Sequence, residues 1–159
     1  MKLLLYSVIG IVFIIALMLI GLSIASRKVP ELGLVNGQLR PCPATPNCVC
    51  SEWKVEGAYV EPLRYSTSAK HAWDMIKQTI DKTGGIIVSE QNMYLHATYQ
   101  TPLLRFIDDV EIRLDDEHKL IHIRSASRVG RSDMGTNRKR VAHIRTIFER
   151  QFKSSKTVH

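Results

Sequence analysis

The stretch FIDDVEIRLDDEHKLIHIRSASR, residues 106–128, predicts a β-hairpin that fixes the fold class. Apolar and charged residues alternate on both sides of a polar turn, as they do in half-buried strands. Pairing Leu114 with Ile121 collects the apolar side chains on one face, because successive strand residues point to opposite faces. The same register sets Glu111 opposite Arg124 on the other face. A slip of one residue would place apolar side chains against charged ones.

This register has consequences for three polar residues of the hairpin. Asp108 and Ser127 share the core face near the end of the ladder. A buried carboxylate is unfavourable unless it has partners, so Asp108 is either a structural group that meets an arginine or a functional acid. His122 is expected as an exposed cross-strand neighbour of Arg113.

The sequence on either side of the hairpin predicts two helices and three further strands. Apolar residues recur at helical spacing over residues 68–82, with Ser68 or Ser66 as a cap and Gly84 as the end. A second helix is expected over about 137–152, and strands over 60–65, 86–89 and 94–101. Strands that follow one another without crossover helices pair antiparallel. The fold class is therefore α+β, with an antiparallel sheet and both helices packed on one face.

The N-terminal run LLLYSVIGIVFIIALMLIGLSIA, residues 3–25, contains no charged side chain. As a helix it reaches about 34 Å at 1.5 Å per residue, enough to cross a hydrocarbon core of about 30 Å. We expect a transmembrane anchor at 1–25, a linker and cysteine-containing arm at 26–59, a globular domain at 60–153 and a tail at 154–159. The alternative is a cleavable signal peptide, whose apolar core is usually shorter, with residues 23–25 as the cleavage site.

All three cysteines lie in the segment CPATPNCVC, residues 42–50. Cys42 and Cys48 are close enough in sequence to form a disulfide in an oxidising compartment. A metal site and three reduced cysteines in a cytosolic loop are the alternatives, but no further Cys supplies a fourth ligand. Because Lys2 faces Arg27 and Lys28 across the apolar run, basic residues do not set the orientation. The favoured disulfide places the domain on the extracytoplasmic, periplasmic side, with Cys50 unpaired.

The net charge of +7 is distributed unevenly. Residues 124–156 contain ten Lys or Arg against two acidic residues, whereas residues 26–123 contain eleven against thirteen. Such asymmetry indicates an anionic partner: a small molecule, a lipid headgroup or an acidic protein. No nucleic-acid partner is expected, since the chain has no series of aromatic residues for base stacking.

The basic residues gather where the second helix begins. Arg138, Lys139 and Arg140 would occupy its first turn, against the positive end of the helix dipole, and such violations of local rules concentrate at functional sites. We expect an anion pocket formed by Arg128 and the loop 130–137 and closed by Arg138 and Arg140, with Asn137 as the helix cap or a ligand donor. The alternative is a structural network in which the arginines pair with nearby carboxylates. The candidate ligand-binding residues are Arg124, Arg128, Asp133, Asn137, Arg138, Arg140, Asp108 and Asp109.

Enzyme signals are weak. The chain lacks the sequence motifs of nucleophile elbows, phosphate-binding loops, zinc proteases and dinucleotide sites, so no catalytic residue, metal or cofactor is assigned. The predicted function is a membrane-tethered cell-envelope domain that binds an anionic ligand or acidic partner. One alternative is a hydrolase or transferase that uses Asp108 or Asp109 as an acid or base, and another is an envelope assembly factor.

Three segments resemble, in order, the motifs of a bacterial and plant family known as domain of unknown function 1499. They are Cys42–Val49, Arg105–Glu111 and Arg124–Arg140. The family usually has Ser where this chain has Cys50, so the resemblance implies that Cys42 pairs with Cys48. Many relatives begin with an export or membrane segment. The resemblance implies no activity, because none is established for the family.

Overall fold

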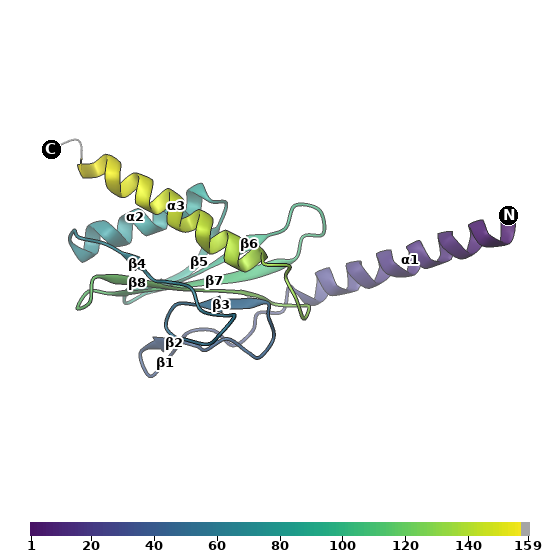
Figure 1. The fold of residues 1–159 in the computed structure, drawn as a ribbon, viewed down its shortest axis with the longest axis horizontal. Coiled ribbons are helices and arrows are strands. Elements are labelled where there is room, and N and C mark those ends of the chain that lie inside the picture. The colour runs from purple at the N-terminus through teal and green to yellow at the C-terminus, as the bar shows by residue number, and fades with distance from the viewer. Residues whose placement is uncertain (157–159) are drawn as a thin grey trace.

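A computed structural model describes residues 1–156, with side chains as far as residue 154. Helix α1, Lys2–Ala25, extends away from a mixed domain of sheet and helices (Figure 1). Among the described helices, α1 is the one long and apolar enough to cross a membrane. The predicted fold class is confirmed: an apolar N-terminal helix precedes an antiparallel sheet with two further helices.

The main sheet has six strands in the described chain. The strand order is β3-β8-β7-β6-β5, and β4 also pairs with β8. Each of these pairs is antiparallel. The bounds are β3 Cys48–Cys50, β4 Leu63–Arg64, β5 Ile86–Gln91, β6 Tyr94–Gln100, β7 Ile107–Asp115 and β8 Leu120–Ser127. The predicted strand over 60–65 is thus reduced to β4, and the β5 strand continues two residues further than expected.

The hairpin register predicted from alternation is confirmed. Leu114 lies opposite Ile121, Glu111 opposite Arg124, and Asp108 opposite Ser127. The apolar face of β7 and β8 packs against the helices, because burial of its aliphatic side chains is favourable.

Helices α2, Ala69–Lys82, and α3, Thr136–Lys156, cover one face of the sheet (Figure 1). The side chain of Ser68 caps α2 by accepting a hydrogen bond from the backbone N–H of His71 at 3.3 Å. Gly84, with φ +86°, follows the end of α2 in the left-handed conformation that favours glycine. The helices and the sheet enclose one apolar core, whose largest fully buried side chains include Ile76, Ile80, Leu95, Ile112, Ile121, Ile123, Ile144 and Phe148.

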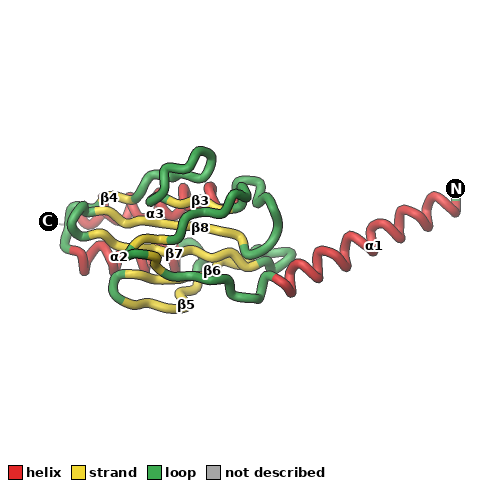
Figure 2. The backbone as a smooth tube through the Cα atoms, turned by 90° about the horizontal axis from the view of Figure 1, so that it is seen from below, coloured by secondary structure: helices red, strands yellow, loops and turns green. Residues whose placement is uncertain are grey.

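The segment 26–59 packs on the opposite face of the sheet (Figures 1 and 2). It contributes β3 to the main sheet and forms a small hairpin from β1, Leu34–Val35, and β2, Gln38–Leu39. Leu39 is fully buried, and its carbonyl accepts a hydrogen bond from Trp53 Nε1 at 2.7 Å. We call residues 26–59 the arm. Because the arm covers this face, it excludes water from charged strand residues.

One expectation about this face is wrong. His122 is buried, not exposed, because the arm lies over it. Its ring lies 3.3 Å from Ser51 Oγ, and its neighbour Arg113 donates to the buried carboxylate of Glu52 at 2.7 Å. Alternation placed both side chains on the correct face but did not reveal that the arm covers it.

The C-terminal end of the domain differs slightly from the expected bounds. Helix α3 begins at Thr136 and continues through Lys156, past the expected end near residue 152 and into the segment expected as a tail. Residues 157–159, the rest of that expected tail, lie outside the described residues.

Candidate ligand-binding site

The three sequence segments that carry the family resemblance meet at the end of the sheet from which α1 emerges. Asn47 connects the first to the third: its amide Nδ2 donates to the carbonyl of Gly130 at 2.6 Å. The Asn47 carbonyl accepts from the backbone N–H of Ser127 at 3.0 Å and from Asn137 Nδ2 at 2.9 Å. The cysteine loop and the basic motif therefore form one structural unit.

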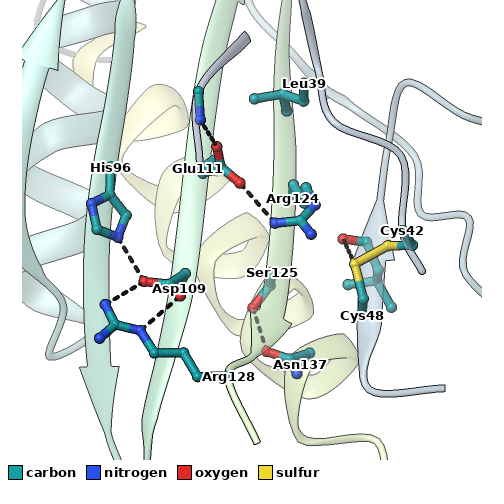
Figure 3. Close-up of polar contacts among 12 residues, drawn as sticks. Leu39, Cys42, Cys48, His96, Asp109, Glu111, Arg124, Ser125, Arg128 and Asn137 are labelled. Atoms are coloured by element: carbon teal, nitrogen blue, oxygen red, sulfur yellow. Dashed lines mark hydrogen bonds and ion pairs between the residues drawn. A yellow bond between two sulfur atoms is a disulfide. The ribbon is translucent and has the colours of Figure 1, made fainter. Parts of the chain in front are cut away.

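Five buried or half-buried polar side chains lie between the sheet and the arm: His96, Asp109, Glu111, Arg124 and Arg128 (Figure 3). We call them the polar layer. Arg128 forms a two-pronged ion pair with Asp109, through Nε at 2.9 Å and a terminal nitrogen at 2.7 Å. His96 Nε2 lies 2.7 Å from the same carboxylate.

Asp109 is held in its charged form. Burial raises the pKa of the Asp109 carboxyl, but the hydrogen bonds from His96 and Arg128, together with the Arg128 charge, outweigh burial and leave the pKa below its usual value. An acid that works by donating a proton near neutral pH needs the opposite shift. The geometry thus favours a structural role for Asp109.

Glu111 and Arg124 form the second ion pair of the polar layer. Glu111 is fully buried and accepts from the backbone N–H of Gly33 at 2.9 Å and from the Tyr94 hydroxyl at 2.8 Å. Arg124 donates to its other carboxylate oxygen at 2.7 Å. This is the one polar contact of the Arg124 side chain within the described chain, and the buried Arg124 Nε has no partner there. Arg124 therefore retains unused donors.

Asn137 joins β8 to α3 beneath the basic motif. Its side chain is fully buried and accepts from Ser125 Oγ at 2.6 Å (Figure 3). Its amide Nδ2 donates to Ser127 Oγ at 2.9 Å, in addition to the Asn47 carbonyl. Asn137 is thus inside the helix and bonded on both ends of its amide, rather than acting as the helix cap.

The other expected site residues also have partners in the chain. Arg140 pairs with Asp108 and lies over the ring of Tyr99 at 4.9 Å. Asp133 caps α3 by accepting from the backbone N–H of Asn137 at 2.7 Å. Arg138 points elsewhere and donates to backbone carbonyls of residues 57 and 59. The eight residues are thus divided. Arg124, Arg128 and Asp109 lie together on the arm face of the sheet, and Asp108, Asn137 and Arg140 lie on the helix face. Asp133 caps α3, and Arg138 lies on another surface.

Two cavities flank the loop that follows β8. The first, which we call the Arg124 cavity, has a volume of about 330 Å³, and Asn47, Arg124, Ser127 and Arg128 contribute to its walls. The second, which we call the α1 groove, has a volume of about 440 Å³. Its lining includes Leu19, Leu22, Leu104, Phe106, Val129 and Met134. The first cavity is lined by the two arginines together with the carboxylates of Glu31 and Asp109, and the second is mostly apolar.

One serine–histidine pair of the described residues is closed to solvent. Ser51 and His122 are adjacent but both are buried, and neither lines the Arg124 cavity or the α1 groove. Within residues 1–156, no group of three or more His, Cys, Asp or Glu side chains is arranged to hold a metal ion.

The cysteine loop contains the predicted disulfide. Cys42 and Cys48 are joined with their Cα atoms 5.6 Å apart, and Cys50 is a buried free thiol. Burial raises the pKa of the Cys50 thiol, which keeps it in the unreactive protonated form.

Comparison with known families agrees with this geometry. The profile of the family described as "Protein of unknown function (DUF1499)" matches residues 38–148. The chain belongs to this family. The DUF1499 match begins at β2 and ends within α3, so it includes the cysteine loop, the polar layer and the basic motif but not α1. No curated protein and no solved structure matches the chain significantly.

Sequence reasoning missed several residues of the site. Asn47 lies inside the cysteine motif. The predictions for that motif rest on its thiols, and they do not include the hydrogen bonds that Asn47 makes to Gly130 and Asn137. His96 and Tyr94 precede the hairpin and give no local signal, because their partners Asp109 and Glu111 lie on the neighbouring strand.

Proposed function

We propose that this DUF1499 chain is a membrane-anchored extracytoplasmic protein that binds a small anion, a carboxylate or a phosphate group, in the Arg124 cavity. The observation that carries the proposal is the Arg124 side chain, which lines the cavity with unused donors while a buried carboxylate holds it in place.

Retention of α1 as an anchor is supported by Ser26, the residue after the helix. Ser26 is fully buried, and its Oγ accepts from the backbone N–H of Ile107 at 3.2 Å. Cleavage after Ala25 would create a charged amino group at this buried position, which is unfavourable without a partner. Together with the length of α1, this favours a permanent anchor over a cleaved signal peptide.

The extracytoplasmic location is supported by the disulfide between Cys42 and Cys48. Disulfides persist in oxidising compartments and are rare where thiols are kept reduced. Cys48 is also buried next to β8, so the bond is part of the packed structure rather than an accessory on the surface.

The donor that the cavity offers to an anion comes from Arg124. Glu111 occupies one terminal nitrogen and Nε is buried, so the other terminal nitrogen is the group that faces a ligand, and charged donors make the stronger hydrogen bonds to carboxylate and phosphate. Ser127 also lines this cavity, but its Oγ lies on the core face of β8, where it accepts from Asn137. In this proposal Arg124 contacts the ligand, whereas Arg128 and Asp109, which also line the cavity, support its wall.

The test measures ligand-induced stabilisation of the full chain in a neutral detergent. Inorganic phosphate and succinate are added at constant ionic strength, with chloride as the reference, and thermal unfolding is followed. A ligand that binds only the folded state raises Tm in a saturable way. No rise beyond that in chloride, with either probe at millimolar concentration, would refute the site.

A matched pair of variants tests the location without removing a structural contact. Pro43→Glu adds a carboxylate to an exposed residue that lines the cavity, and Ser66→Glu adds the same charge on an exposed residue before α2. We expect Pro43→Glu to abolish the anion-induced rise in Tm because of charge repulsion, and Ser66→Glu to retain it. An equal response of the two variants would mean that the anion binds elsewhere.

A further inference from the structure

We infer that the end of the domain next to α1 is a lipid-contacting surface that rests in the interfacial zone of the bilayer. This surface consists of the residues after α1, 26–28, and two loops, 101–106 and 129–136; we call it the membrane-proximal face. The inference is separate from the anion site but rests on the proposed anchoring by α1.

The first observation is that α1 is fixed to the domain rather than joined by a loose linker. Besides the buried Ser26, Arg128 donates from one terminal nitrogen to the carbonyls of Ser26 at 3.2 Å and Arg27 at 3.3 Å. These carbonyls lie at the C-terminal end of α1, where the last carbonyl groups of a helix have no backbone N–H partner within the helix. A domain held in this way cannot move far from the membrane surface.

The second observation is the depth at which the loops contact α1. The α1 groove includes Leu19 and Leu22 in its wall. At 1.5 Å per residue these side chains lie about 9 and 4 Å before the end of the helix at Ala25. Helix α1 has 24 residues and is therefore only about 6 Å longer than the hydrocarbon core of about 30 Å. Loops that line a groove together with Leu19 therefore reach the headgroup level.

The third observation is the apolar character of the loop tips. Leu103 is 88% exposed and Met134 is 89% exposed. Both tips are at the end of the domain from which α1 emerges (Figures 1 and 2). Met134, with φ +53°, occupies a left-handed conformation that is uncommon for a bulky residue. Leucine and methionine fully exposed to water are unfavourable, and insertion between lipid headgroups would bury them.

The fourth observation is the charge around these tips. Arg27, Lys28, Arg105 and Arg131 are exposed on this face, and their charged groups make no hydrogen bond or ion pair with other described residues. Basic residues at this level attract anionic headgroups. Apolar tips surrounded by basic side chains match a phospholipid surface better than a protein partner. When the face rests on lipid, the apolar α1 groove accepts a segment of a lipid chain.

The test uses the full chain in vesicles of phosphatidylcholine with and without phosphatidylglycerol. Leu103→Cys and Met134→Cys are labelled with an environment-sensitive fluorophore. Cys50 is 1% exposed and the other cysteines are in a disulfide, so the native protein does not react. Glu117→Cys, in the exposed β7–β8 turn at the far end of the same strands, is the matched control.

We expect labels at 103 and 134 to be quenched several-fold more by lipid-borne quenchers than the label at 117, and several-fold less by aqueous iodide. Phosphatidylglycerol should increase this difference, and the double variant Arg105→Gln, Arg131→Gln should remove the increase. Equal iodide quenching at all three positions, in a chain that resists carbonate extraction, would overturn the inference while leaving the anchor intact.

Two other outcomes would also overturn it. Protection of the labels only at high protein density, with cross-linking between Leu103→Cys copies, would make the face a contact between copies of the chain. Release of the chain by carbonate would show that α1 is no anchor, in which case the proposed location and this face both fail.

Discussion

Asn137 connects three segments of this chain that are distant in sequence. It accepts from Ser125 and donates to the Asn47 carbonyl and to Ser127. A single amide therefore holds the cysteine loop, β8 and α3 together. Buried networks of this kind stabilise a fold only when each group is satisfied.

We expect Asn137→Ala to lower the free energy of unfolding by about 3 kcal/mol, because several buried donors and acceptors lose their partner. Urea unfolding of the full chain in detergent measures the change. Lys139→Ala, on an exposed residue of the same helical turn, is the control and should have little effect. A loss for Asn137→Ala no larger than the control would contradict the role of the amide.

The carboxylate of Asp109 predicts a pH dependence. Its pKa is lowered in the folded protein, so its contribution is complete above the unfolded value of about 3.9 and is lost as the pH falls towards the folded value. The difference in unfolding free energy between wild type and Asp109→Asn should therefore be largest near pH 6 and shrink below pH 4. A difference that stays constant from pH 6 to pH 3 would refute this linkage.

At the scale of elements, the domain is stabilised by segments that are distant in sequence. Arg128 on one side of the sheet holds both Asp109 of β7 and the carbonyls that follow α1. The cysteine loop is held to β8 through β3 and Asn47. Both contacts act on the same end of the sheet, where the cavities lie.

Removal of Arg128 should separate these elements. Arg128→Ala leaves Asp109 with a buried charge, and we expect a loss of about 3–5 kcal/mol. It also frees the chain after α1, so trypsin should cleave faster after Arg27 and Lys28. The control is Arg131→Ala, which removes an exposed arginine of the adjacent loop. Unchanged stability and cleavage in Arg128→Ala would show that the ion pair does not fasten α1.

The disulfide should contribute less than the ion pair. Cys42 and Cys48 are separated by six positions, and closing so short a loop restricts the unfolded chain by about 2 kcal/mol. Reduction with dithiothreitol should lower the unfolding free energy by this amount in wild type. A Cys42→Ser, Cys48→Ser variant should not respond to the reductant; if it responds as wild type does, the effect has another origin.

At the scale of the whole molecule, the proposed location of the domain rests on α1 and the disulfide. We expect alkaline phosphatase fused after His159 to be active in a bacterial host, because that reporter needs an oxidising compartment to form its own disulfides. A reporter that functions only in the cytoplasm should stay inactive in the same position. The reverse pattern would place the domain in the cytoplasm and contradict the proposed orientation.

The sequence by itself determined the apolar helix, the strands and helices after residue 60, the hairpin register and the disulfide, but not the short strands β1, β2 and β3 of the arm. These features depend on local periodicity and short separations: Leu114 and Ile121 are on adjacent strands joined by one turn, and Cys42 is six positions from Cys48. Local patterns identify such neighbours because the chain between them is short.

The tertiary structure alone decided which charged groups are free. Arg124, Arg128 and Arg140 are equivalent in the sequence, as basic residues of one motif. Their partners come from β7 and from the arm, which covers the second face of the sheet: Gly33 reaches Glu111 across 78 positions, and Arg128 reaches Ser26 across 102. Burial by the arm removes water from Arg124 and Arg128 and forces them to pair, whereas Arg140 pairs with Asp108 on the helix face. Of the two arginines under the arm, Arg124 makes a single polar contact with the described residues.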